Sequence, residues 1–394
     1  MRRVLVILLL VACLDGCSLF RHTLSYSELH RRALVADLHS DAALRMMNGA
    51  DFGKRDTTGH MDIPRLREGG VDLQVMACWL ATETPIETCR PHVDSMIDSL
   101  DAQLARYPDQ IELCRTSSEA NRIIDQGKIA IFIGIENGVA IADNLDNLRH
   151  FYDRGVRYLT LTHTASNDWC ISSADTAPAF HGLTDFGREV VRRMNELGMI
   201  IDVSHASPEA VDEILKVTTD PVIASHSCVR ALCDHNRNLT DEQIKAIVAN
   251  GGVIGINFWN VYLSADVKRI DDSVMAAHKA ELDSIFSLYK DDHEARNKAA
   301  TPIYSAADSA AQRVNITVET LVDHIDYIVK LAGPDHVALG SDYDGIPTVP
   351  IGLEDCSKLS NITAELVKRG YSVKDIKKIL GGNFMRVFKK VCDS

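Results

Sequence analysis

Seven ionisable residues of the types that bind metal ions stand where short apolar segments of this 394-residue chain end. They are His39, Asp41, Glu136, His163, His205, His226 and Asp342. Imidazole nitrogens and carboxylate oxygens are favoured zinc ligands, whereas Mg²⁺ and Ca²⁺ sites prefer oxygen ligands. A single histidine near a strand end is more often structural, so the prediction of a zinc-type site depends on the whole set.

The spacing of these residues predicts two metal ions rather than one. His39 and Asp41 are two positions apart, so in an extended strand they point the same way and can bind one ion. His205 and His226 are 21 residues apart, which suits neighbouring strands, and can bind a second ion. A lone carboxylate such as Glu136 at the end of an apolar strand would be costly to bury without a cation. Its two oxygens can bridge two ions about 3.5–4 Å apart, as in two-metal hydrolases.

The elements that must position these residues form an alternation of short apolar strands and amphipathic helices. The expected strands are Val35–Asp37, Asp72–Cys78, Ile129–Ile135, Tyr158–Thr162, Met199–Val203, Pro221–Ala224, Val253–Asn257 and Val337–Gly340. Most are continuous apolar runs, which is typical of strands buried on both faces of a parallel sheet. Eight such units favour an α/β fold of the (β/α)8 TIM barrel type, in which all carboxyl ends of the strands meet at one rim. A doubly wound sheet is the alternative, because strand order is not visible in a sequence.

Helical patterns lie between the strands. Clear examples are Pro85–Tyr107, Thr184–Leu197 and Ser207–Val217, the last of which opens with an N-cap serine and a proline at N1. The charged, helical stretch Ser264–Val314 is an insertion between strands seven and eight. We expect it either to cover or flank the barrel mouth as a lid or to be a solvated excursion without function.

The first seventeen residues are typical of an export signal. A basic start at Arg2 and Arg3 precedes an apolar run from Val4 to Ala12, which is too short to span a bilayer of roughly 30 Å. The run ends near Cys13 and Cys17, in a pattern similar to the lipobox of bacterial lipoproteins, with Cys17 slightly favoured as the acylated residue. We therefore expect a leader at 1–17, one hydrolase domain at 18–394, and a periplasmic or cell-surface lipoprotein. A cleaved soluble signal is the alternative.

Composition excludes some classes of protein and partner. The net charge of −13 makes nucleic acid and anionic membranes poor partners. Eight cysteines lie beyond the leader and none forms a CxxC pair, so a cysteine zinc cluster is not expected. Export permits disulfides, and Cys78 with Cys89 is a plausible pair around a loop.

Several motifs in combination resemble those of the membrane dipeptidase (renal dipeptidase-like) family of the amidohydrolase superfamily, from about Asp37 to Phe388. They are Asp37-Leu-His39-Ser-Asp41, His60-Met-Asp62-Ile-Pro64-Arg65-Leu66, Ile133-Gly-Ile-Glu136, Leu159-Thr-Leu-Thr-His163, Asp202-Val-Ser-His205, Ala224-Ser-His226-Ser227, Arg237-Asn238-Leu239, Gly340-Ser-Asp342-Tyr-Asp344-Gly345 and Leu380-Gly-Gly-Asn383-Phe384.

The resemblance implies a zinc-dependent dipeptidase and a role for each matching residue. His39 and Asp41 match the ligands of the first Zn²⁺, His205 and His226 those of the second, and Glu136 the bridging glutamate. His163 matches the residue that stabilises the tetrahedral intermediate, and Asp342 the acid near the bridging water. Arg237 matches the arginine that binds the dipeptide carboxylate, with Asn238 and His163 also expected at the substrate. Dimers are common in the family, so a homodimer is an option.

The expected reaction is hydrolysis of a dipeptide, including one with a C-terminal D-residue, by a water or hydroxide shared between two Zn²⁺ ions per chain. One competing interpretation is another binuclear amidohydrolase that acts on a cyclic amide, lactone or phosphoester. Many of those enzymes use a carboxylated lysine as the bridge, whereas no lysine ends a strand here. The other is a lipoprotein that binds peptides without hydrolysing them, although no expected ligand is missing.

Overall fold

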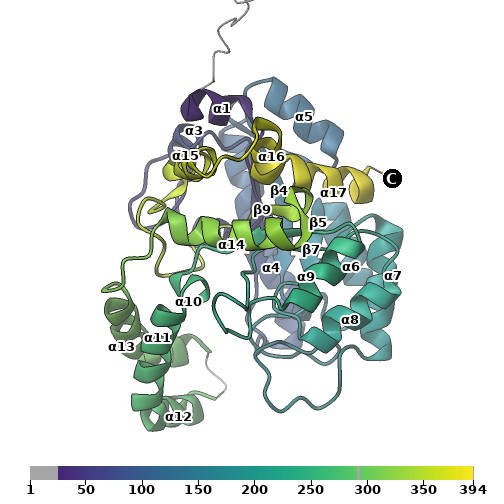
Figure 1. Ribbon diagram of the computed structural model, residues 1–394. Helices are drawn as coiled ribbons and strands as arrows, with labels where there is room; N and C mark the ends of the chain where they lie inside the picture. Colours follow the sequence, from purple (N-terminus) through teal and green to yellow (C-terminus); the bar gives the residue numbers. More distant parts are fainter. Residues whose placement is uncertain (1–24, 291–292, 394) are drawn as a thin grey trace, which may run out of the picture.

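The computed structural model describes residues 25–290 and 293–393, and its centre is a closed barrel of eight parallel strands (Figure 1). The barrel strands are β1 (Ala36–Asp37), β2 (Leu73–Trp79), β4 (Ile129–Glu136), β5 (Val156–Thr160), β6 (Ile200–Asp202), β7 (Ile223–Ala224), β8 (Val253–Ile256) and β9 (Val337–Leu339). Each pairs with its neighbours in the order β2-β1-β9-β8-β7-β6-β5-β4. Pairing of β2 with β4, from Leu73↔Ala130 to Trp79↔Glu136, closes the ring. The (β/α)8 prediction is therefore confirmed, and the doubly wound alternative is wrong.

All eight predicted strands are present, but the prediction missed a ninth. The short strand β3 (Ile111–Leu113) pairs with the first residues of β4, Ile129–Ile131, before β5 joins that edge. It is outside the closed ring and does not carry any of the predicted site residues.

Side chains fill the barrel interior, as is usual for this fold. Phe132 and Tyr158 project into it from β4 and β5 and are completely buried. Phe384 and Phe388 close the end at which the strands begin, and both lie edge-on to Phe132, at ring distances of 5.7 and 5.0 Å. The interior is therefore a packed core, and space for a substrate remains only at the carboxyl ends of the strands.

The outer helices follow the predicted pattern. They are α1 (Tyr26–Arg32), α2 (Ala42–Met47), α3 (Ile63–Glu68), α4 (Ile86–Arg106), α5 (Ser117–Asp125), α6 (Leu145–Arg154), α7 (Asp185–Leu197), α8 (Pro208–Val217), α9 (Asp241–Ala249), α10 (Asn260–Leu263), α14 (Val318–Ala332), α15 (Ser360–Lys368), α16 (Val373–Lys377), the π-helical turn η4 (Lys378–Gly382) and α17 (Asn383–Cys392). The predicted N-cap at Ser207 is also confirmed, since its side chain accepts a hydrogen bond from Ala210 N at the start of α8. Thr184 caps α7 in the same way.

The insertion between β8 and β9 is helical, as predicted. It consists of α11 (Ala265–Ala277), α12 (Lys279–Leu288) and α13 (His293–Ala311), which extend away from the barrel beside its mouth (Figure 1). Arg296 of α13 forms a 2.7 Å ion pair with Glu83, in the loop that follows β2. The insertion thus flanks the mouth, while none of its described residues lines the cavity reported below.

The eight cysteines of the described part of the chain are all free and buried, so the suggested Cys78–Cys89 disulfide is wrong. The Cys89 thiol instead donates hydrogen bonds to the carbonyls of Thr84 and Pro85, each at 3.5 Å. Burial raises the pKa of Cys78 to about 12 and of Cys89 to about 11, so both are protonated at neutral pH. Within the described residues, no helix is long and apolar enough to cross a bilayer. The expected leader and its cysteines lie outside the described residues.

Candidate active site

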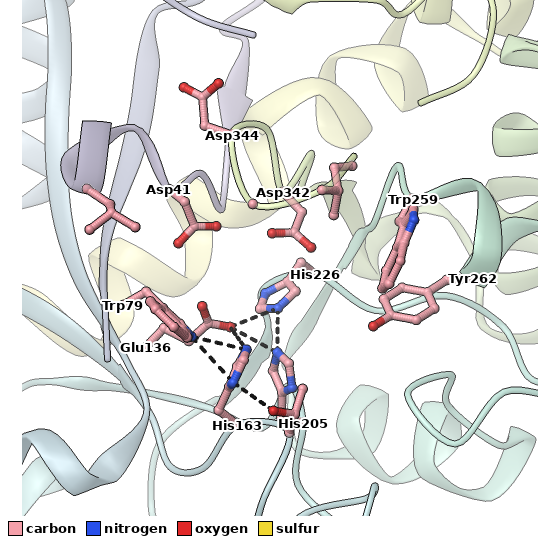
Figure 2. Close-up of a pocket in the computed structure, with 14 residues that line it drawn as sticks. Asp41, Trp79, Glu136, His163, His205, His226, Trp259, Tyr262, Asp342 and Asp344 are labelled. Atoms are coloured by element: carbon pink, nitrogen blue, oxygen red, sulfur yellow. Dashed lines mark hydrogen bonds and ion pairs between the residues drawn. The ribbon is translucent and has the colours of Figure 1, made fainter. Parts of the chain in front are cut away.

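The seven ionisable residues singled out in the sequence meet at the carboxyl ends of the barrel strands. Six of them, all but His39, line a cavity of about 340 Å³ (Figure 2). His39 is completely buried beneath it, with its Nε2 atom 3.4 Å from Glu136. Six different strands therefore deliver these side chains to one place, as the sequence predicts.

Glu136, the last residue of β4, lies between two groups of potential ligands. Its Oε2 atom lies 3.4 Å from Nε2 of His39. Its Oε1 atom lies 2.9 Å from Nε2 of His205 and 3.2 Å from Nε2 of His226. The two carboxylate oxygens therefore face different histidines, which is the arrangement that a bridging carboxylate requires.

On the first side of Glu136, His39, Asp41 and Asp342 bring ligand atoms within 4.8 Å of one another. His39 Nε2 and Asp41 Oδ1 are both buried and make no hydrogen bond. Asp41 is the N-cap residue of α2, yet its side chain makes no capping bond. Leaving buried polar atoms unsatisfied is costly, and a bound cation would satisfy both.

On the second side of Glu136, the Nε2 atoms of His205 and His226 lie only 3.0 Å apart. Two imidazole nitrogens at this separation suit two ligands of one ion with bonds of about 2.0 Å. Glu136, His163 and His205 also form a group with ligand atoms within 4.8 Å. The donor set on both sides, imidazole with carboxylate, fits a zinc-type metal centre.

The electrostatics of the two sides differ. Burial opposes protonation of His39, but the carboxylates of Glu136, Asp41 and Asp342 raise its pKa to about 10. Burial lowers the pKa values of His205 and His226, so both are neutral and ready to act as ligands. Burial also opposes ionisation of Glu136, yet the surrounding histidines hold its pKa well below the usual range. The carboxylates around His39 therefore favour a positive charge at this position, and a bound divalent cation would provide it.

A network beneath the ligands fixes the orientation of two histidines. His39 Nδ1 lies 2.8 Å from the Tyr158 hydroxyl, which directs Nε2 toward Glu136. His226 Nδ1 lies 2.7 Å from the Ser225 hydroxyl, which donates at 2.6 Å to Asp202. Buried partners of this kind set the tautomer of a metal-binding histidine. Neither Asp202 nor Ser225 was assigned a role from the sequence.

Asn257, just after β8, donates a 2.8 Å hydrogen bond to Oδ2 of Asp342. Asp342 and His205 both have left-handed backbone conformations, with φ of 63° and 68°. Such conformations cost of order 1–3 kcal/mol in residues other than glycine and often occur at functional sites. Gly340 makes room for this turn, because a Cβ atom there would lie 1.8 Å from the Ser225 carbonyl. Asn257 was missed because it carries no charge, although it ends a predicted strand.

His163 follows β5 and lies at the edge of the cavity. Burial lowers its pKa, so the ring is neutral. The Trp79 indole packs edge-on to the ring at 5.6 Å between centroids. The Thr164 hydroxyl lies 3.2 Å from Nδ1. The Trp79 indole N–H also donates toward Nε2 at 3.3 Å. In the tautomer that carries the proton on Nε2, the neutral imidazole would instead donate to a developing oxyanion.

Arg237 and Asn238, the predicted substrate residues, are buried and are not among the residues that line the cavity. Arg237 donates from Nη2 to the His226 carbonyl at 3.1 Å, and its Nε atom has no partner. Asn238 uses its amide to hold the carbonyls of Cys233 and Tyr262, each at 2.8 Å. The guanidinium lies 5.5 Å from the Tyr262 ring centroid. Arg237 therefore lies directly behind the cavity wall, and Asn238 supports that wall.

Three aromatic side chains, which sequence reasoning missed, form much of the cavity wall. Trp79 is the last residue of β2, and Trp259 and Tyr262 follow β8. The Trp259 and Tyr262 rings meet edge to face at 4.7 Å, and Figure 2 shows the Tyr262 hydroxyl pointing toward the histidines. Trp79 directly follows the predicted strand Asp72–Cys78, and Trp259 lies two residues beyond the predicted strand Val253–Asn257, which was the available signal for these two; Tyr262, in α10, had none. They give the cavity apolar sides above a polar floor.

Comparison with known proteins agrees with this geometry. The profile of the family described as membrane dipeptidase (Peptidase family M19) matches residues 24–394. The crystal structure of the probable dipeptidase PvdM from Pseudomonas aeruginosa is 30% identical in sequence, with a TM-score of 0.81, over 93% of this chain and 98% of that one. A metallopeptidase from Rhodobacter sphaeroides, liganded with a phosphinate mimic of the dipeptide L-Ala-D-Ala, has the same fold. It is 23% identical, with a TM-score of 0.74, over 91% and 99% of the two chains.

Proposed function

The chain belongs to the membrane dipeptidase family. We propose that it hydrolyses dipeptides with one zinc ion bound on each side of Glu136. Membership makes it a peptidase hydrolase of a metal-dependent family. The observation that carries the two-ion proposal is the separation of the Glu136 oxygens, one toward His39 and one toward His205 and His226.

In this proposal each side of Glu136 supplies one ligand set. His39 and Asp41 hold the first ion, and His205 and His226 hold the second. Zinc ions held by these residues would lower the pKa of a bound water, so that a nucleophile would be available near neutral pH. The buried, unpaired atoms of His39 and Asp41 support the first site, and the facing nitrogens of His205 and His226 support the second.

The protein itself supplies a base, an acid and an oxyanion donor. Asp342 Oδ1 lies 4.0 Å from His39 Nε2, while Oδ2 is held by Asn257. We propose that Asp342 accepts the proton that the attacking water loses and then donates it to the departing amine. His163, which burial keeps neutral, donates a hydrogen bond to the oxygen of the former carbonyl as negative charge develops there.

The cavity limits the substrate to short peptides. Its volume of about 340 Å³ and its aromatic walls suit two residues rather than a folded chain. We propose that the Arg237 guanidinium, whose Nε has no partner, binds the free carboxylate of the dipeptide as a planar donor. The L-Ala-D-Ala mimic bound by the Rhodobacter sphaeroides enzyme supports extending the proposal to dipeptides with a C-terminal D-residue.

A panel of dipeptides, tripeptides, lactones and phosphoesters tests this function. The proposal expects hydrolysis of dipeptides, with L- or D-residues at the second position, and about two zinc ions per chain. Preferential hydrolysis of a lactone, cyclic amide or phosphoester would show another amidohydrolase activity. Peptide binding without turnover by zinc-loaded protein would contradict the proposal.

We also propose that the chain is an exported lipoprotein, anchored through Cys17 or Cys13. The basic start, the short apolar run and the cysteines near its end support this proposal. Mass spectrometry of the N-terminal peptide from membrane fractions tests it. A diacylglyceryl-modified cysteine is the expected result, whereas a cleaved, unmodified N-terminus in the soluble fraction would overturn it.

A further inference from the structure

Positive charge is concentrated in the last part of this acidic chain. Residues 368–394 contain eight lysines and arginines against two aspartates, a net charge of +6, whereas the whole chain has −13. The segment forms α16, η4 and α17. These elements pack at the end where the barrel strands begin, opposite the candidate active site (Figure 1). This segment is therefore a basic region of an otherwise acidic chain, so the net charge of −13, which makes an anionic membrane a poor partner for the chain as a whole, does not describe this end of the barrel.

An open groove of about 790 Å³ crosses this end of the molecule. Its lining includes Lys374, Lys377, Lys378 and Arg386, with Asp335 as the acidic residue among the lining side chains. Lys378 is paired with Asp335, but Arg386 donates to the backbone carbonyls of Gly251 and Asp335, which leave its charge uncompensated. The groove therefore has a positive lining that the described acids only partly neutralise.

Several cations of this face also point to solvent without an ionic partner. Lys374 and Lys377 of α16 and Lys389 of α17 are exposed, and none forms a salt bridge within the described part of the chain. Lys389 lies one turn beyond Arg386 on the same helix face. Val373, beside Lys374, is 48% exposed. These cations are spread over a broad face and have an apolar side chain among them. Such an arrangement suits an extended anionic surface better than one small anion, which a closed site would surround.

The N-terminal end of the described chain lies at the same end of the barrel. Helix α1, whose last turn contains the exposed Arg31 and Arg32, packs on α15 close to α16 (Figure 1). Twenty-four residues precede Ser25, including the apolar run Val4–Ala12. The basic face and the point where the N-terminal segment, with its proposed lipid anchor, enters the domain are therefore on one side of the molecule.

We infer that this basic face docks on the anionic surface of a phospholipid bilayer. Clustered lysines and arginines near a membrane gain affinity for anionic head groups, roughly fivefold for each residue, and salt screens the effect. In this orientation the active-site mouth points away from the bilayer, toward soluble substrates. The acidic remainder of the protein would be repelled by the same surface, which favours this orientation over others.

Vesicle binding by the full chain tests the inference. Vesicles of phosphatidylcholine alone measure the binding that the N-terminal anchor contributes, and vesicles that also contain phosphatidylglycerol add the negative surface. We expect an affinity at least about tenfold higher for the anionic vesicles than for the neutral vesicles at low salt. The two affinities should become nearly equal as salt is added. The variant K374E/K377E/K389E should lose this preference while keeping its melting temperature and dipeptide hydrolysis. The neutral variant K374Q/K377Q/K389Q should be intermediate.

A matched control carries the same change in charge at the other end. K279E/K290E/K298E alters three exposed lysines of the insertion and should retain the preference. Equal binding of the natural chain to both kinds of vesicle would overturn the inference. An equal loss of the preference for anionic vesicles in both triple variants would also overturn it, because binding would then depend only on the net charge of the protein. Displacement from anionic vesicles by dilute inorganic phosphate would also overturn it, because the face would then be a site for a small anion.

Discussion

The side-chain amide of Asn257 donates a 2.8 Å hydrogen bond to Oδ2 of Asp342, and so fixes the carboxylate that we assign as the proton carrier. The bond joins the ends of two neighbouring strands, β8 and β9. Its effect is to hold one Asp342 oxygen away from the ligands and turn the other, Oδ1, toward His39 at 4.0 Å.

Replacing Asn257 with alanine should therefore lower kcat by about 10- to 100-fold, the usual effect of losing a buried partner of a metal-site residue. Steady-state kinetics on a dipeptide, with zinc content measured in parallel, checks this. The control Asn361→Ala removes a hydrogen bond to Gly352 far from the cavity and should leave kcat unchanged. An unchanged kcat in Asn257→Ala would refute the role of this bond.

Ser225→Ala should weaken metal binding, because the Ser225 hydroxyl links His226 to Asp202. We expect zinc affinity at the second site to fall by about 10- to 100-fold, measured by competition with a chelator. Ser227→Ala is a close control, since the Ser227 hydroxyl is buried next to His226 but has no partner. Equal zinc affinity in the two variants would rule out the orienting role.

Arg237→Ala should lower kcat/KM for dipeptides by about 10- to 100-fold, the range expected for a lost hydrogen bond to a charged group. Arg230 is the control, because its guanidinium contacts only the backbone carbonyls of His235 and Asn236 among the described residues. Arg230→Ala should keep most of the activity. If dipeptide kinetics are identical in Arg237→Ala and the natural enzyme, Arg237 does not bind the carboxylate.

Acid should destabilise the fold through His324. This buried ring accepts a hydrogen bond from Val229 N and lies 3.0 Å from the Leu263 carbonyl, and burial lowers its pKa to about 4. The unfolded chain has a histidine pKa of about 6.5, so it takes up the proton first as pH falls. The contribution of the neutral His324 ring to the free energy of unfolding is therefore fully present above about pH 6.5. It falls by about 3 kcal/mol as the pH is lowered toward 4.

Chemical denaturation at several pH values measures this loss. His324→Gln removes the titrating group, so its free energy of unfolding should change less between pH 6.5 and 4 than that of the natural chain. The exposed His278, changed to Gln, should leave the pH dependence as it is. A pH dependence that is the same in all three proteins would exclude His324 as its source.

Much of the architecture could be predicted because buried parallel strands have a strong signature in sequence. Runs such as Ile129–Ile135 are continuously apolar, and acids and histidines directly after them stand out. The strand Ile111–Leu113 gave little signal, because it is three residues long and contains Glu112. The closure of the ring between β2 and β4 depends on contacts between distant segments, which a sequence does not display.

The neutral parts of the site could not be predicted in the same way. Asn257, Ser225 and Trp259 carry no charge, and such residues end strands for many structural reasons. The position of Arg237 behind Tyr262 depends on the path of a loop, which no strand pattern determines. The ionisable residues were predictable since burying several of them together makes sense only with a cation.

Zinc-edge anomalous diffraction from crystals of the zinc-loaded enzyme tests whether Glu136 lies between two metal ions. We expect two peaks about 3.5–4 Å apart, one beside His39 and Asp41 and one beside His205 and His226, with the Glu136 carboxylate between them. A single peak, or two peaks of which neither contacts Glu136, would contradict it.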